Sequence, residues 1–120
     1  MQKRILVLDD NQDILDIMRE ALLYQEFEVK VTMDSSSIIN LAKQYQPDLI
    51  ILDYHLAGSN GYDICRNLKT HPTLGHIPVI ICSAYIQKNA DLSSWGCDDV
   101  IAKPFGLQEL TEKVSNLIFG

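Results

Sequence analysis

The sequence is poor in residues on which several classes of protein depend. Only three cysteines occur in 120 residues, and Cys65, Cys82 and Cys97 form no CxxC pair. Because three thiols cannot all pair, we expect them to stay reduced. The three histidines also lack the spacing of metal ligands, so no structural zinc site is predicted.

Long apolar stretches and positive charge are also scarce. No run reaches the roughly 18 apolar residues that cross a membrane, and Gln2, Lys3 and Arg4 lead into a short strand-like run rather than a signal peptide. The 10 Lys and Arg against 16 Asp and Glu give a net charge of −6, so the basic surplus that nucleic-acid binding requires is missing. We expect a cytoplasmic protein whose partners include neither a membrane nor nucleic acid.

The chain is long enough for one hydrophobic core, and one domain covering residues 1–120 is expected. Short apolar runs typical of strands buried on both faces lie at residues 5–8, 29–32, 49–52, 79–82 and 100–102. Between them, helices are predicted at residues 14–22, 38–45, 61–70, 87–95 and 107–118. This alternation predicts an α/β fold in which helices cover both faces of a parallel sheet.

The residues that end the predicted strands carry most of the chemistry. Parallel sheets of this kind bind ligands beyond the carboxyl ends of their strands. The ends of the first, third, fourth and fifth strands supply Asp9 with Asp10, Asp53, Ser83 and Lys103. Three carboxylates, a hydroxyl and an ammonium group are therefore predicted to converge on one edge.

Each of these residues also has a purely structural explanation. An Asp after a strand often caps the next helix, and Asp53 could form a turn before the nearby glycines. Ser83 could be a loop hydroxyl and Lys103 a surface charge. Their joint occurrence at four strand ends nevertheless favours a common site.

The combination suits phosphoryl transfer to a carboxylate. Magnesium takes oxygen ligands, typically one or two carboxylates together with waters and a substrate phosphate. Aspartate side chains can form aspartyl phosphates, and Asp53 stands alone on the central strand between the acidic pair and the other groups. The pattern predicts Asp53 as the nucleophile, with magnesium, Lys103 and Ser83 stabilising the phosphoryl oxygens.

Four segments resemble the receiver domain of two-component response regulators. They read LVLDDNQD, PDLIILDYHLAGSNGYDICRNLK, IPVIICSAY and GCDDVIAKPF, beginning at residues 6, 47, 77 and 96. The resemblance implies a flavodoxin-like, doubly wound sheet of five parallel strands in the order 2-1-3-4-5. It also implies phosphorylation by a histidine kinase or phosphotransfer protein, signalling to a downstream protein partner or effector domain, and a monomer or weak dimer.

The resemblance also assigns roles in the site. Asp53 would be the phosphoacceptor, and Asp10, Asp53 and the backbone carbonyl of His55 would bind magnesium directly, with Asp9 acting through water. Ser83 and Lys103 would contact the phosphoryl oxygens. The bond between Lys103 and the next residue, a proline, would be cis. Such a domain is not an enzyme, although it assists its own phosphorylation and dephosphorylation.

Some positions depart from the pattern of that family. Ala57 stands where a proline is usual, and Val100 where receivers usually carry Tyr or Phe. Because valine has one stiff χ1 angle and little reach, we expect the response to phosphorylation mainly in residues 83–95, with Tyr85 as a substitute aromatic. His55 and Tyr85 would both border the phosphoryl group.

Three other classes of protein share parts of this pattern. A haloacid-dehalogenase-type phosphatase needs a second carboxylate two residues after Asp53, where this chain has His55. A flavin or nucleotide module would need a glycine-rich loop after the first strand. A phosphorylation-independent pseudo-receiver, acting as a protein interaction module, normally lacks one of the five site residues. A stand-alone receiver and one cut from a larger protein remain equally compatible with the sequence.

Overall fold

The computed structural model describes residues 2–56, 59–84 and 96–120. Its central sheet has five parallel strands in the order β2-β1-β3-β6-β7, which confirms the predicted order. The strands are β1 (Arg4–Leu8), β2 (Glu28–Thr32), β3 (Leu49–Asp53), β6 (Val79–Ser83) and β7 (Asp99–Ala102). The helices are α1 (Gln12–Tyr24), α2 (Ile38–Tyr45), α3 (Gly61–Thr70) and α4 (Leu107–Phe119), with a 3-10 turn, η1 (Ser35–Ser37), before α2.

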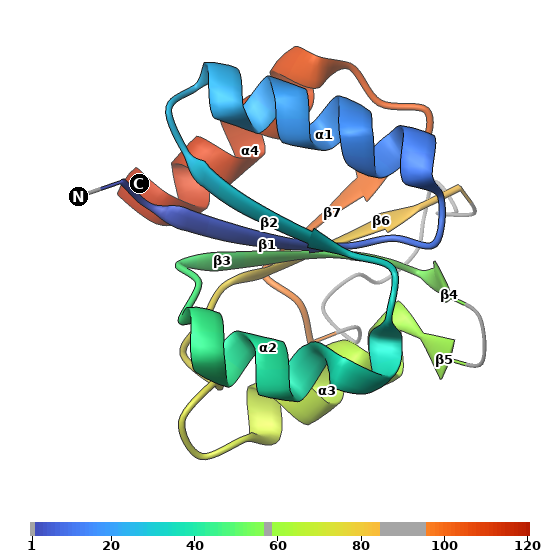
Figure 1. The fold of residues 1–120 in the computed structure, drawn as a ribbon, viewed down its shortest axis with the longest axis vertical. Helices are drawn as coiled ribbons and strands as arrows, with labels where there is room; N and C mark the ends of the chain where they lie inside the picture. Colours follow the sequence, from blue (N-terminus) through green and yellow to red (C-terminus); the bar gives the residue numbers. More distant parts are fainter. Residues whose placement is uncertain (1, 57–58, 85–95) are drawn as a thin grey trace.

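Helices cover the sheet on both faces, α1 and α4 on one and α2 and α3 on the other (Figure 1). Successive strand residues point to opposite faces, so each strand contributes to two cores. In β1, Ile5 and Val7 pack toward α1 and α4, whereas Leu6 and Leu8 pack toward α2 and α3. β3 and β6 are buried along their whole length, which explains their almost entirely aliphatic sequences.

Two asparagines start helices at the carboxyl edge of the sheet. The side-chain oxygen of Asn11 accepts hydrogen bonds from the backbone N–H groups of Asp13 and Ile14, at 2.9 and 3.2 Å. Asn60 caps α3 in the same way, accepting from the N–H of Asp63 at 2.8 Å. Such caps satisfy backbone donors that a helix leaves unpaired, and they fix where α1 and α3 begin.

The structure adds one element that the sequence did not predict. Residues His55–Leu56 (β4) and Ser59–Asn60 (β5) pair as a short antiparallel ladder between β3 and α3. The predicted helix at residues 87–95, Tyr85 and Ala57 lie outside the described residues. Within the part of the chain that the structure describes, no helix combines the length and apolar character needed to span a membrane.

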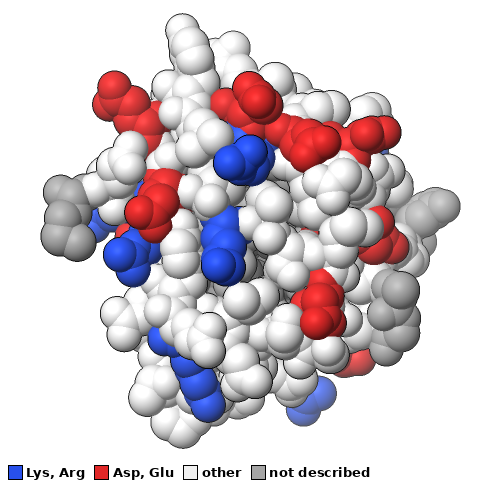
Figure 2. Space-filling model, viewed as in Figure 1, with Lys and Arg blue, Asp and Glu red and all other residues white. Residues whose placement is uncertain are grey.

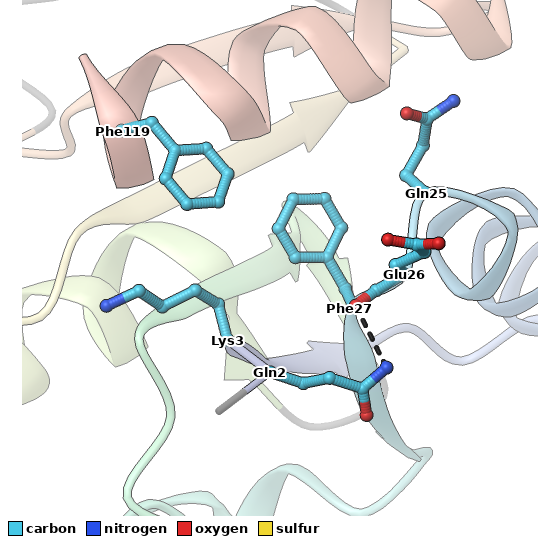
Figure 3. Close-up of a pocket in the computed structure, with 6 residues that line it drawn as sticks. All are labelled: Gln2, Lys3, Gln25, Glu26, Phe27 and Phe119. Atoms are coloured by element: carbon cyan, nitrogen blue, oxygen red, sulfur yellow. Dashed lines mark hydrogen bonds between the residues drawn. The ribbon is translucent and has the colours of Figure 1, made fainter.

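The amino edge of the sheet carries paired charges and an aromatic stack. Arg4 Nε lies 3.1 Å from a carboxylate oxygen of Glu28, and the rings of Phe27 and Phe119 stack with centroids 6.1 Å apart. A surface hollow opens beside these rings (Figure 3). Its lining residues are Gln2, Lys3, Gln25, Glu26, Phe27 and Phe119. Both ends of the described chain therefore lie at this edge.

Candidate functional site

Strand pairing and backbone hydrogen bonds at the carboxyl end of the sheet place the predicted site residues. Asp53 ends β3, the central strand, and stands opposite Cys82 of β6. The N–H of Asp9 donates to the carbonyl of Thr32 at 3.3 Å. On the other side, the N–H of Lys103 donates to the carbonyl of Ser83 at 2.8 Å. Strand pairing thus fixes Asp9, Asp53, Ser83 and Lys103 along one edge.

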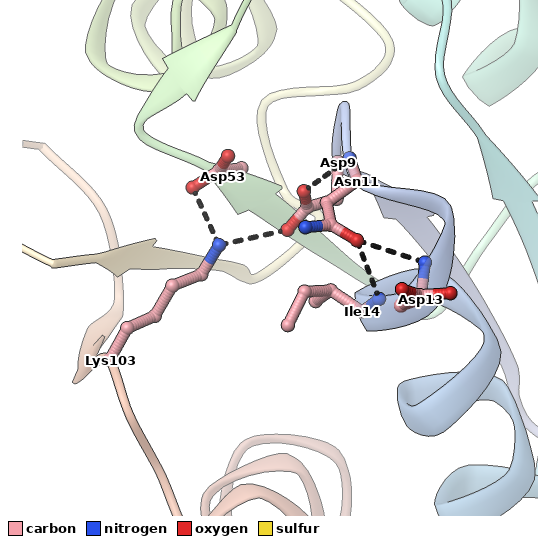
Figure 4. A network of polar contacts seen from close by, with 6 residues as sticks. All are labelled: Asp9, Asn11, Asp13, Ile14, Asp53 and Lys103. Atoms are coloured by element: carbon pink, nitrogen blue, oxygen red, sulfur yellow. Dashed lines mark hydrogen bonds and ion pairs between the residues drawn. The ribbon is translucent and has the colours of Figure 1, made fainter.

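Lys103 joins two buried carboxylates that are far apart in the sequence (Figure 4). Its Nζ atom donates to Asp9 Oδ2 and to Asp53 Oδ1, both at 3.1 Å. The side chains of Asp9 and Asp53 are only 2% and 7% exposed. Because a buried carboxylate is costly without a charged partner, Lys103 is the group that makes this arrangement tolerable. The bond between Lys103 and Pro104 is cis, as predicted.

Three carboxylates form a cluster with the chemistry of a metal site. One oxygen from each of Asp9, Asp10 and Asp53 lies within 4.8 Å of the others. Asp9 and Asp53 are buried, whereas Asp10 is exposed. Hard oxygen ligands of this kind suit Mg²⁺ or Ca²⁺ rather than softer metals, so the donor set fits the expected magnesium ion.

The crowding of charge changes the proton affinities of two groups. Burial raises the pKa of Asp53, and the nearby Asp9 and Asp10 raise it further, while the hydrogen bond from Lys103 opposes this. Burial alone would lower the pKa of Lys103, but its hydrogen bonds to Asp9 and Asp53 outweigh that effect and raise it. Lys103 therefore favours the ionised form of Asp53, which burial and the neighbouring carboxylates disfavour.

Acidic side chains are also frequent on the side of the molecule that contains the site. In Figure 2, red side chains lie across the top and down the right-hand side, toward which the carboxyl ends of the strands point in Figure 1, with two further groups at the left, while blue side chains lie mainly at the centre and left. Asp13 and Asp63 lie in the first turns of α1 and α3. An acidic flank concentrates cations from solution, which is consistent with a divalent-ion site.

Two residues that support the site were not identified from the sequence. The backbone N–H of Asn11 donates to Asp9 Oδ1 at 2.9 Å. Gly61 packs so closely that a Cβ atom there would lie 2.5 Å from the carbonyl oxygen of Asp53. Asn11 could have been found from its place before an apolar helix, which is typical of an N-cap. Nothing local in the sequence indicates the contact made by Gly61.

The other predicted site residues lie at or next to the same edge. Ser83 is the last residue of β6 and is 1% exposed. His55 begins β4, two residues after Asp53, with an exposed side chain whose ring meets that of Tyr54 edge-on at 5.0 Å. Val100 is buried within β7. The roles predicted for Ser83 and for the carbonyl of His55 stay predictions.

Comparison with known proteins gives a consistent result. A family model described as the response regulator receiver domain matches residues 5–115. The response regulator PleD of Caulobacter vibrioides is 32% identical over 119 residues, which cover 98% of this chain and 26% of PleD. The polar-differentiation response regulator DivK of Brucella anthropi is 27% identical over 120 residues, covering 98% of both chains. The chain thus spans about a quarter of PleD and nearly all of DivK.

A solved structure is similar over the same extent. The response regulator protein TrrA of Thermotoga maritima was crystallised in complex with Mg²⁺-BeF. It superposes on this chain with a TM-score of 0.86 at 30% identity, covering 97% of this chain and 99% of TrrA. The similarity therefore extends over both the sheet and the edge that carries the carboxylates.

Proposed function

Because this chain belongs to the response regulator receiver domain family of two-component signalling, we propose that it accepts a phosphoryl group on Asp53 in a magnesium-dependent reaction. One observation carries the proposal: the Asp53 carboxylate lies at the end of the central strand, bonded to Lys103 and clustered with Asp9 and Asp10. In this family the donors are generally histidine kinases and the recipients of the signal are downstream effectors. For this chain we propose a histidine kinase or phosphotransfer protein as donor.

The chemistry follows from groups already in place. A carboxylate oxygen of Asp53 forms the new bond to phosphorus while the bond from phosphorus to the donor nitrogen breaks and the leaving imidazole keeps the electron pair. Asp10, Asp53 and the carbonyl of His55 would hold magnesium, with Asp9 acting through water. When bound, the ion supplies neutralisation of charge on the phosphoryl oxygens. Lys103 orients those oxygens with its ammonium group.

In this proposal, Ser83 senses the phosphoryl group and changes its arrangement in response. Its hydroxyl belongs to the last residue of a fully buried strand, and it would donate a hydrogen bond to a phosphoryl oxygen. The chain then acts on itself rather than on a separate substrate, so we classify it as a phosphoacceptor and not as an enzyme. Signalling to a partner would follow from the changed arrangement around Ser83.

Intact-mass analysis tests the proposal directly. The protein is incubated with magnesium and either acetyl phosphate or phosphoramidate, and the mass of one phosphoryl group should appear. Asp53→Asn should remove the adduct, whereas Asp16→Asn, an exposed change on α1, should leave it in place. If wild type gains no adduct from either donor, the chain is a pseudo-receiver and the proposal fails.

Two variants separate the roles of the supporting groups. Lys103→Met should still bind magnesium but should form the adduct at least about tenfold more slowly, because the phosphoryl oxygens lose a point charge. Ser83→Ala should form the adduct yet show a reduced spectral response to beryllofluoride. A full response in Ser83→Ala would remove Ser83 from the proposed signalling step.

A further inference from the structure

Asn11 makes two kinds of contact at once. Its side-chain oxygen caps α1 through the N–H groups of Asp13 and Ile14, and its carbonyl accepts from the N–H of Leu15 at 3.1 Å. Its own N–H points the other way and donates to Asp9 Oδ1 at 2.9 Å. The first turn of α1 and the acidic site are therefore joined through a single residue (Figure 4).

Both carboxylate oxygens of Asp9 accept hydrogen bonds from protein groups. Asp9 Oδ1 accepts from Asn11, and Asp9 Oδ2 accepts from Lys103 at 3.1 Å. Asp9 is 1% exposed, so its orientation is set by these protein groups rather than by solvent. Asp10 is exposed. Asp9 thus has the environment of a fixed supporting group, and Asp10 that of a ligand open to an arriving cation.

We propose that Asn11 is a positioning residue of the magnesium site, acting through Asp9. Its cap holds the backbone at φ −109° and ψ 113°, and that conformation aims the N–H at the carboxylate. Every residue except proline has a backbone N–H, but only a capping side chain keeps it fixed against the first turn of α1. The inference rests on the proposed magnesium-dependent function and extends it to a residue with no direct contact to the ion.

Titration calorimetry with magnesium chloride tests the role without relying on phosphorylation. Asn11→Ala should weaken magnesium binding about tenfold, the lower end of the effect of removing groups that orient a metal ligand. Asn11→Ser, which keeps a capping oxygen, should bind within about twofold of wild type. If Asn11→Ser binds as weakly as Asn11→Ala, the cap is not what positions Asp9.

A buried residue at the other end of α1 provides the control for general stability. Leu22 is fully buried, eleven residues after Asn11 on the same helix. Leu22→Val should cost about 1 kcal/mol of stability but should change the magnesium affinity less than about twofold, because it leaves the cap and Asp9 untouched. An equal loss of affinity in Leu22→Val would reduce the role of Asn11 to general helix stability.

A double-mutant cycle shows whether Asn11 acts through Asp9. In an Asp9→Ala background, Asn11→Ala should cause no further loss of magnesium affinity, because the acceptor is already gone. A full tenfold loss in that background would overturn the inference. Wild-type protein that binds no magnesium would instead refute the proposed function itself, so the two failures are distinguishable.

Discussion

The amino and carboxyl edges of the same five-stranded sheet differ in how their cations and anions are balanced. At the amino edge, cations and anions pair one to one: Arg4 with Glu28 at 3.1 Å and Lys69 with Asp98 at 2.6 Å. At the carboxyl edge, among the described residues, Lys103 is the one cation paired with Asp9 and Asp53, and Asp10 adds a third carboxylate to the cluster. The amino edge is balanced within the protein, whereas the carboxyl edge has an excess of negative charge.

This difference separates groups that stabilise the fold from groups kept for a ligand. Like charges in a small volume destabilise a folded protein unless a counter-ion arrives. The amino-edge pairs are half-exposed, so each contributes little and any one could be replaced. The unbalanced charge at the carboxyl edge lowers the stability of the fold, a cost that is common at binding and reactive sites. Stability measurements should therefore distinguish the two edges by sign as well as by size.

The largest contrast should come from removing one cation at each edge. Without divalent ions, Lys103→Met should lower the free energy of unfolding by about 3 kcal/mol, because Asp9 and Asp53 are left buried without a counter-charge. Arg4→Met should cost about 1 kcal/mol or less, because Glu28 has a side chain 45% exposed to solvent. Urea denaturation in EDTA measures both, and equal losses would contradict the comparison.

A second contrast concerns the thiols beneath each edge. Burial raises the pKa of Cys82, in β6 beside Asp53, to about 12. The pKa of Cys97 at the amino edge is also raised by burial, although that residue is partly exposed. Both raised pKa values leave less thiolate at a given pH, but Cys82 is fully buried whereas Cys97 is partly exposed. At pH 8 iodoacetamide should therefore modify Cys97 at least about tenfold faster than Cys82. Peptide mapping reports this ratio, and Cys97→Ser should abolish the fast phase.

A smaller effect should follow from removing one negative charge at each edge. Without magnesium, Asp10→Asn should raise the melting temperature by about 4 °C, equivalent to about 1 kcal/mol, because it relieves repulsion within the cluster. Asp48→Asn at the amino edge should instead lower it, since the Asp48 carboxylate accepts from the N–H of Arg4 at 2.8 Å.

Adding magnesium completes that test. The ion should stabilise wild type more than Asp10→Asn, because a ligand that binds the native state stabilises it more the tighter it binds, with the logarithm of [L]/Kd. Asp48→Asn should show the same magnesium shift as wild type. Calorimetric scans with and without magnesium give these values, and identical shifts in all three proteins would show that Asp10 takes no part in metal binding.

The sequence predicted the sheet well because each buried strand leaves a clear apolar run. The runs that became β3 and β6 end at Asp53 and Ser83 as the structure has them, since a polar residue marks the point where the strand leaves the core. The ladder of β4 and β5 was missed because two-residue strands contain no periodicity. The bond from Asn11 to Asp9 was missed for another reason: its donor is a backbone N–H, which every residue except proline possesses.

The shared hollow at the amino edge has a consequence for how such a domain can be used in larger polypeptides. Gln2 near one end of the chain and Phe119 near the other line the same depression, a strand's length, or roughly 16 Å, from the carboxylates. A polypeptide fused at either end would therefore emerge away from the edge where a phosphoryl donor must approach. The two ends could also be joined by a short linker and the ring reopened elsewhere, since neighbouring termini favour circular permutation and insertion. The chain ends, where fusion partners would attach, and the reactive edge therefore lie on opposite sides of the fold.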